Sequence, residues 1–237
     1  MLPHLEAAIV ACRRCPRLIA YCARVAAEKR RMYQADTYWG RPVPGWGDPA
    51  ARVLLVGLAP AAHGANRTGR MFTGDGSGDF LIPALHRAGF ATQPASTHKD
   101  DGLELRGLYM AAAAHCAPPA NKPTRQELLN CRPHLVQHLA RLPSLRVILA
   151  LGQIGFDAAL AALAESGLAL PRPRPLFGHG AHYRFGPYHL IASYHPSRQN
   201  TNTGRLTPAM LDLALAKVRD VLGTGDSREG AGDSRVS

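Results

Sequence analysis

Short apolar segments that alternate with longer amphipathic ones constrain the fold of this chain more than any other feature. Arg146–Leu151 ends at Gly152, as a buried parallel strand does. Leu108–His115 is ambiguous, because its alanines also suit a helix. Strands that alternate with helices favour a parallel or mixed sheet covered on both faces. The five predicted strands are Arg52–Leu58, Leu108–His115, Arg146–Leu151, His182–Phe185 and His189–Ser193.

The segments between these strands carry apolar residues at helical spacing. Gly78–Ala88 has Pro83 at a position that suits a first turn, and Thr124 with Glu127 has the spacing of a capping box. Thr207-Pro208 offers an N-cap and a proline at the first helical position, and that helix is predicted to close at Gly223. The predicted helices are Leu5–Tyr33 with a break at Pro16, Gly78–Ala88, Thr124–Leu142, Phe156–Glu165 and Thr207–Leu222.

A single α/β domain over residues 1–223 accounts for all of these elements in a chain of 237 residues. Residues 224–237 are rich in Gly, Ser, Asp and Arg and have no apolar period, so we expect a disordered tail. No apolar run approaches the roughly 20 residues that cross a bilayer. The N-terminus lacks the pattern of a secretory signal. We therefore expect a soluble, cytoplasmic protein without a membrane partner.

The charge of the chain indicates its class of partner. Lys and Arg number 28 against 17 Asp and Glu, which gives a net charge of +11, and only four of the 28 are Lys. The Arg guanidinium binds phosphate oxygens in a bidentate manner. A GC-rich genome would explain Arg in place of Lys, but less easily the shortage of acids. The excess therefore favours a polyanionic partner, most simply nucleic acid.

The cysteines predict a metal site rather than disulfides. The chain has five, an odd count that argues against a disulfide framework in a cytoplasmic protein. Cys12 and Cys15 are separated by two residues, which lets both thiolates reach one metal centre. Cys116 follows a predicted strand and Cys131 lies in the helix after it, a wide spacing that favours an iron–sulfur cluster over a zinc ribbon. Ordinary half-buried thiols are the alternative.

Three polar loops are predicted to meet at the carboxyl edge of the sheet, where open α/β sheets bind ligands. The first, residues 59–78, has five glycines between 64 and 78 but no Gly-Lys-Ser/Thr, so it is not a P-loop. It holds Asp75, which in the simplest interpretation only caps the next helix. The second, residues 116–124, holds Asn121, and the third, residues 194–204, begins with Tyr194 and His195. The chemically capable residues of the first loop are His63, Asn66, Phe72 and Asp75.

These stretches together resemble the bacterial and archaeal iron–sulfur uracil-DNA glycosylases over about residues 10–220. The resemblance is carried by Gly57-Leu-Ala-Pro60, Phe72-Thr-Gly-Asp75, His195-Pro-Ser197 and the cysteine spacing. The family 5 (type B) branch is the closer match. Family 4 typically has an acidic residue where this chain has Leu58, and the insertion 64–69 and the segment 199–204 also look like family 5.

The resemblance implies a compact α/β domain with a central, mainly parallel four-stranded sheet. It also implies a [4Fe–4S] cluster, with zinc as the less favoured metal. By motif position, the ligands would be Cys12, Cys15, Cys116 and Cys131. Family 5 enzymes are reported to remove uracil and deaminated purines such as hypoxanthine from DNA. A repair glycosylase that leaves an abasic site, acting as a monomer at the nucleoid, is therefore expected.

The resemblance also implies roles for individual residues. Phe72 would stack on the extruded base, His195 would donate a hydrogen bond to uracil O2, and Asp75 would orient water or stabilise the sugar cation. Because Leu58 is not acidic, the site depends on Asp75 alone for nearby negative charge. Asn121, Ala59 and His63 are predicted to contact the base. The residues predicted to contact DNA are Asn66, Arg198, Gln199, Asn200 and Arg205.

Two other functions fit parts of the pattern. A non-catalytic nucleic-acid-binding module with a structural metal needs the basic surface and the cysteines, but gives no joint role to Phe72, Asp75 and His195. A small-molecule hydrolase would use Asp75 and His195, and its affinity would depend little on salt. DNA binding, in contrast, weakens steeply as salt screens the phosphates.

Overall fold

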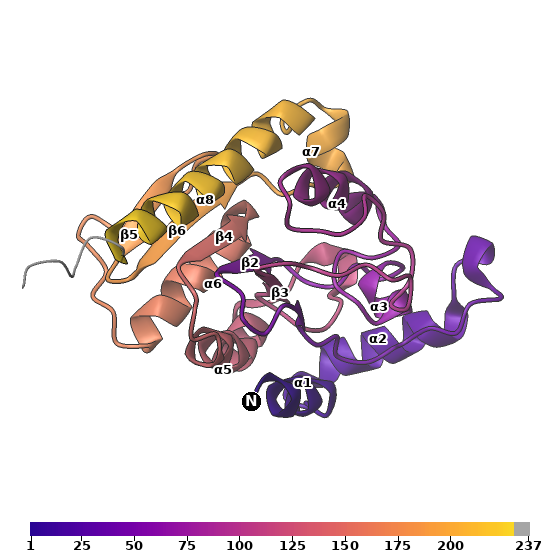
Figure 1. The fold of residues 1–237 in the computed structure, drawn as a ribbon. Coiled ribbons are helices and arrows are strands. Elements are labelled where there is room, and N and C mark those ends of the chain that lie inside the picture. The colour runs from indigo at the N-terminus through magenta and orange to yellow at the C-terminus, as the bar shows by residue number, and fades with distance from the viewer. Residues whose placement is uncertain (230–237) are drawn as a thin grey trace, which may run out of the picture.

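A six-stranded mixed sheet runs through the middle of the protein (Figure 1). The computed structural model describes residues 1–229. The strands are β1 (Trp46–Gly47), β2 (Val53–Gly57), β3 (Leu108–Ala112), β4 (Val147–Leu151), β5 (His182–Phe185) and β6 (Tyr188–Ser193). They lie in the order β1-β3-β2-β4-β6-β5.

The four central strands β3, β2, β4 and β6 are mutually parallel, and the two edge strands are antiparallel to their neighbours. The expected four-stranded sheet is therefore correct for the centre only, since the observed sheet is mixed and larger by one strand at each edge. β3 is a strand despite its alanines, because all five of its residues are buried between β1 and β2. β1 is only two residues long, too short to show an alternating pattern.

The described residues form eight α-helices and two short 3₁₀ helices, Arg31–Tyr33 and Pro119–Asn121. The predicted break at Pro16 is confirmed, and the capping box of Thr124 and Glu127 is present with both of its hydrogen bonds. None of the described helices is long and apolar enough to cross a membrane. The helices are α1 (Leu2–Val10), α2 (Pro16–Glu28), α3 (Ala65–Thr68), α4 (Gly76–Arg87), α5 (Arg125–Arg141), α6 (Gly152–Glu165), α7 (Arg198–Asn202) and α8 (Pro208–Glu229).

Three details of the helices differ from the predictions. Pro83 lies inside α4 rather than in its first turn, because the Asp75 cap starts this helix at Gly76. The last helix continues past Gly223 to Glu229, so the start of the predicted tail is helical. The rest of that tail, residues 230–237, lies outside the described residues. α3 and α7 lie in segments that we predicted as loops, since four or five residues carry no detectable helical period.

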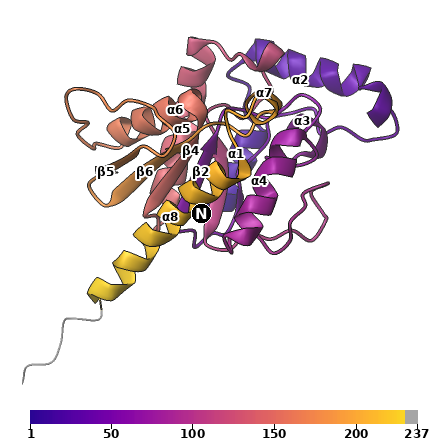
Figure 2. The same ribbon diagram turned by 90° about the horizontal axis from the view of Figure 1, so that it is seen from above.

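Helices lie on both faces of the sheet (Figure 2). Alternating side chains of the central strands build a core on each face. Leu55 and Leu149 contribute to the core that contains residues of α4 and α8. Leu54 and Ile148 contribute to the core on the other face, with residues of α1, α5 and α6. Because both faces are covered, the ends of the parallel strands are left for the polar loops. The loops after β2, β3 and β6 all leave from the same edge.

Candidate active site

A cavity of about 390 Å³ opens at the carboxyl edge of the sheet, a volume at the lower end of the range for small-molecule sites. Gly57 at the end of β2 and Ala112 at the end of β3 form part of its wall. The three predicted loops all contribute to it. The predicted site residues that line it are Ala59, Phe72, Asp75, Asn121, His195 and Gln199.

The two carboxylate oxygens of Asp75 have different surroundings. Its Oδ1 accepts hydrogen bonds from the backbone N–H groups of Ser77 (2.9 Å) and Gly78 (3.0 Å), so the residue caps α4. Within the described residues no hydrogen bond reaches Oδ2, which lies so close to Gly64 that a Cβ there would overlap it. Burial raises the pKa of the Asp75 carboxyl above its ordinary value, and the two N–H donors offset this only in part.

His195 is held between two elements. Gly152, at φ +80°, begins α6, and a Cβ at this position would lie 3.1 Å from His195 Cβ, so the close approach requires glycine. On the other side, Asn200 Nδ2 in α7 donates to the His195 carbonyl oxygen at 2.8 Å. Burial lowers the pKa of His195 to about 4, so the imidazole is neutral at physiological pH.

Phe72 lies opposite His195, with ring centroids 6.3 Å apart and ring planes at 33°. Its φ of +53° is unusual for a bulky residue and directs the ring at the end of β2. There a Cβ on Gly57 would lie 2.8 Å from Phe72 Cζ. The Phe72 ring and the His195 imidazole both line the same cavity, an arrangement that suits a planar ligand.

The loop after β3 brings two polar side chains to the cavity. Asn121 was predicted from its amide, whereas Lys122 and, from the third loop, Ser197 were not singled out. Lys122 directly follows the predicted Asn121, and Ser197 ends the His195-Pro-Ser197 motif. Their closeness in sequence to predicted residues was therefore the signal that could have found them. Asn121 and Lys122 are exposed, which places them at the mouth of the cavity rather than its floor.

Two predicted residues of the first loop lie away from the cavity. Asn66 is fully buried, and its Nδ2 donates to the carbonyl oxygens of Cys22 and Ala62, so the predicted DNA contact is wrong. His63 does not line the cavity, because its Nδ1 is hydrogen-bonded to the hydroxyl of Tyr38 at 3.0 Å. The predicted base contact of His63 therefore stays a prediction. Neither hydrogen bond could be read from the glycine-rich sequence.

The predicted DNA-contacting residues of the third loop fall into two groups. Gln199 is exposed and lines the cavity. Arg198 is also exposed, and a Cβ on Gly76 would lie 2.7 Å from its Nε. Arg205 is also exposed, with its guanidinium 4.8 Å from the centroid of Tyr194. Their DNA contacts stay predictions. Asn200, in contrast, donates a hydrogen bond from Nδ2 to the His195 carbonyl oxygen, so it helps to hold the histidine in place.

The four predicted metal ligands lie together. Cys12, Cys15, Cys116 and Cys131 line one small cavity between the N-terminal segment and α5, and every cysteine in the chain is free. Asn130 Nδ2 donates to Cys15 Sγ at 3.6 Å, and the backbone N–H of His115 donates to Cys131 Sγ at 3.3 Å. Among the described residues, no three His, Cys, Asp or Glu side chains form a group that could hold a single metal ion.

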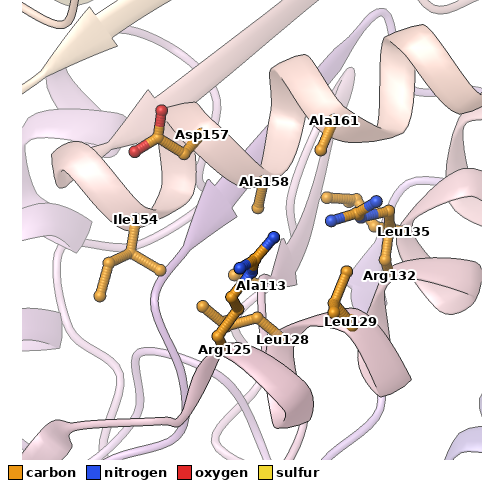
Figure 3. A pocket seen from close by; sticks show the side chains of 10 residues that line it. All are labelled: Ala113, Arg125, Leu128, Leu129, Arg132, Leu135, Ile154, Asp157, Ala158 and Ala161. Carbon is orange, nitrogen blue, oxygen red and sulfur yellow. The ribbon is translucent and has the colours of Figure 1, made fainter.

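A second hollow lies between α5 and α6, on another part of the surface (Figure 3). Leu128, Leu129 and Ile154 make its wall largely apolar. Its one carboxylate, Asp157, already accepts hydrogen bonds from Arg174 and Gln153. Because this hollow has neither a histidine nor an unengaged carboxylate oxygen, it lacks the acid–base groups of the cavity at the strand ends.

Comparison with known proteins agrees with this geometry. Residues 44–219 match the model of the uracil DNA glycosylase superfamily. The chain therefore belongs to that superfamily.

Within the superfamily, the chain is similar to proteins named type-5 uracil-DNA glycosylase. It is 51% identical to one from Thermus thermophilus over 91% of this chain and 95% of that protein. It is 47% identical to one from Pyrobaculum aerophilum over 88% of each chain. A type-4 uracil-DNA glycosylase from the same archaeon is 33% identical over 51% of this chain. The type-5 relatives thus match more of the chain and at higher identity, in line with the family 5 resemblance.

Proposed function

We propose that this protein is a uracil-DNA glycosylase that hydrolyses the bond between uracil and deoxyribose and leaves an abasic site. The observation that carries this proposal is that Phe72, Asp75, Asn121 and His195, from three separate loops, surround one cavity. The names of the type-5 relatives, which cover nearly the whole chain, support uracil in DNA as the substrate. The net charge of +11 suits a phosphate-rich partner.

The cavity receives the base after the nucleotide has left the duplex. Extrusion costs a few kcal/mol, which contacts with the bound base must offset. Stacking on Phe72 contributes about 1–3 kcal/mol, and the exposed amide of Asn121 can bond the base edge at the cavity mouth. The proposal extends to deaminated purines such as hypoxanthine, because about 390 Å³ does not restrict the cavity to one six-membered ring.

His195 stabilises the leaving group. When the C1′–N bond breaks, its electron pair goes to the base, and negative charge develops on uracil O2. With a pKa of about 4, the imidazole is neutral and donates an N–H hydrogen bond to this oxygen. A preorganised donor of this kind is worth about 2.7–4 kcal/mol in the transition state. The Asn200 bond to the His195 backbone supplies that preorganisation.

Asp75 acts on the sugar side of the cavity. Oδ1 stays engaged with the helix N-terminus, while Oδ2 is available to accept a proton from the attacking water. The carboxylate charge first stabilises the cationic sugar as the base leaves with the electron pair of the C1′–N bond. The water oxygen then bonds to C1′ and its proton passes to Oδ2. The capping interaction and the catalytic role are therefore compatible.

We propose that Cys12, Cys15, Cys116 and Cys131 hold a [4Fe–4S] cluster. The fit rests on four free thiols that line one cavity. Such a group would link the N-terminal segment to α5, because its ligands come from both. Hydrolysis of the glycosidic bond transfers no electron, so this role is structural.

Replacement of one proposed ligand tests the cluster. Cys116→Ser should remove the visible absorbance and the bound iron of the purified protein and lower its melting temperature. The matched variant Cys22→Ser, at the fifth cysteine, should keep both the colour and the iron. A colourless wild type that contains stoichiometric zinc would contradict the proposed cluster.

Incubation with DNA tests the proposed function. The wild type, acting as a monomer, should convert a uracil-containing oligonucleotide to an alkali-labile abasic product, and leave the matched thymine oligonucleotide intact. Binding without product would favour the non-catalytic nucleic-acid-binding module. Binding that does not weaken as salt is raised would favour a small-molecule hydrolase. We also propose that the protein acts on DNA at the nucleoid of the cytoplasm.

A further inference from the structure

The loop that carries Asn121 to the cavity has a strained backbone. Ala120 and Asn121 have φ of +53° and +56°, two successive left-handed residues without glycine. Such a conformation persists only where the surroundings fix it. Within the loop, two backbone bonds do so: Asn121 N–H donates to Pro118 O, and Lys122 N–H donates to Pro119 O. Both are local, so they do not fix the loop relative to the rest of the molecule.

Side chains of α2 attach this loop to the body of the protein. Cys22 Sγ donates to the carbonyl oxygen of Ala117 at 3.7 Å, just before the loop. Arg17 Nη2 donates to the carbonyl oxygen of Lys122 at 3.4 Å, at its end. Over the described part of the chain, this Arg17 contact is the one side-chain hydrogen bond to residues 118–122.

Arg17 is itself held by a buried carboxylate. Its Nε and Nη2 donate to the two oxygens of Glu127 at 2.8 and 2.7 Å. The Glu127 side chain is 8% exposed, and its Oε2 also accepts the Thr124 backbone N–H at 2.7 Å in the capping box. The position of the guanidinium is therefore fixed by the start of α5, which immediately follows the loop. A bidentate pair of this kind has defined geometry, which a single charge contact lacks.

The hydrogen bonds of Arg17 connect the cysteine cavity with the cavity at the strand ends. Glu127 lines the cysteine cavity, whereas Lys122 and Asn121 line the cavity at the strand ends. Arg17 lies two residues after Cys15 and reaches from the first cavity to the wall of the second. We propose that Arg17 is a positioning residue that holds the 118–122 loop, and so sets Asn121 against the base. This inference rests on the proposed function for its effect on catalysis.

Hydrogen exchange measured by mass spectrometry without DNA tests the positioning directly. In Arg17→Gln, the amides of Asn121 and Lys122 should exchange about tenfold faster than in the wild type, because the lost contacts involve a charged donor. The control is Arg24→Gln, the same change on the same helix at an exposed residue that pairs with Glu28 on the same helix. It should leave exchange in residues 117–124 unchanged.

The kinetic test uses a double-mutant cycle with Asn121→Ala. If Arg17 acts through the loop, Arg17→Gln should raise KM for uracil-containing DNA about tenfold and change kcat less than about twofold. In the Asn121→Ala background, the same substitution should have little further effect. Arg17→Lys, which keeps the charge but cannot make both the bidentate pair and the Lys122 contact, is the second variant. It should speed exchange in the loop while iron content stays at the wild-type level.

Two results would overturn the inference. One is unchanged exchange at Asn121 and Lys122 in both Arg17 variants. The other is faster exchange spread evenly over α2 and α5 with additive kinetic effects, which would make the ion pair merely structural. A wild type that releases no uracil would instead refute the proposed function, and the exchange result would still decide whether Arg17 positions the loop.

Discussion

Burial sets the chemical state of the two reactive side chains. His195 is kept neutral with a pKa of about 4, and the pKa of Asp75 is raised although two N–H groups donate to its Oδ1. In the proposed mechanism, the neutral His195 donates to the negative charge that develops on the base, and the Asp75 carboxylate acts on the sugar through Oδ2. This division of roles between adjacent groups follows from their surroundings rather than from residue type alone.

Asp75→Asn separates capping from catalysis. Asparagine caps helices about as well as aspartate, so the free energy of unfolding should change by less than about 0.5 kcal/mol. Uracil excision in single turnover should fall by about 100-fold or more, because the amide cannot accept the proton from water. Asp75→Ala is the companion variant and should also lower the free energy of unfolding by about 1 kcal/mol. Wild-type excision by Asp75→Asn would remove this residue from the mechanism.

At the scale of single elements, the short helix α7 matters because it fixes His195. Asn200→Ala removes the bond to the His195 carbonyl, so kcat should fall about tenfold while the Kd for DNA changes less than about twofold. Thr203→Val is the control, since its hydroxyl, at the C-terminal end of α7, donates to the carbonyl oxygens of Gln199 at 2.7 Å and Asn200 at 3.4 Å and not to His195. A larger change in Kd than in kcat would indicate that Asn200 contacts DNA instead.

The central strands and long helices could be predicted from sequence because each has several periods of an apolar pattern. The carboxyl-edge loops could be placed for the same reason, and with them Phe72, Asp75 and His195. β1, α3 and α7 could not, because two to five residues carry no period. The fate of a polar side chain such as Asn66 depends on distant partners, here the Cys22 carbonyl, which local sequence does not encode.

Over the whole molecule, buried neutral histidines make stability depend on pH. The pKa of His138 is held well below its ordinary value by burial, and that of His195 is about 4, against about 6.5 in an unfolded chain. Between pH 6.5 and 4 the unfolded state therefore binds more protons than the folded state. The free energy of unfolding decreases as pH falls through this range. His195 alone accounts for about 3 kcal/mol of this loss in the free energy of unfolding.

Urea unfolding at pH 7.5, 6.5, 5.5 and 4.5 measures this dependence. The midpoint should be nearly constant down to pH 6.5 and then fall steadily. His195→Gln should show a shallower fall over the same range. A midpoint independent of pH between 6.5 and 4.5 would mean that these imidazoles are not buried as described.

Filling one hollow at a time tests most directly whether the cavity at the strand ends is where uracil is released. Ala59→Leu narrows that cavity, and the matched Ala158→Leu fills the hollow between α5 and α6 (Figure 3). The measurement is the single-turnover rate of uracil release from a uracil-containing oligonucleotide, with DNA affinity measured in parallel. We predict that Ala158→Leu has the rate and the DNA affinity of the wild type. Ala59→Leu should bind DNA but release uracil at least about 100-fold more slowly than the wild type. Equal rates for the two variants would contradict the account.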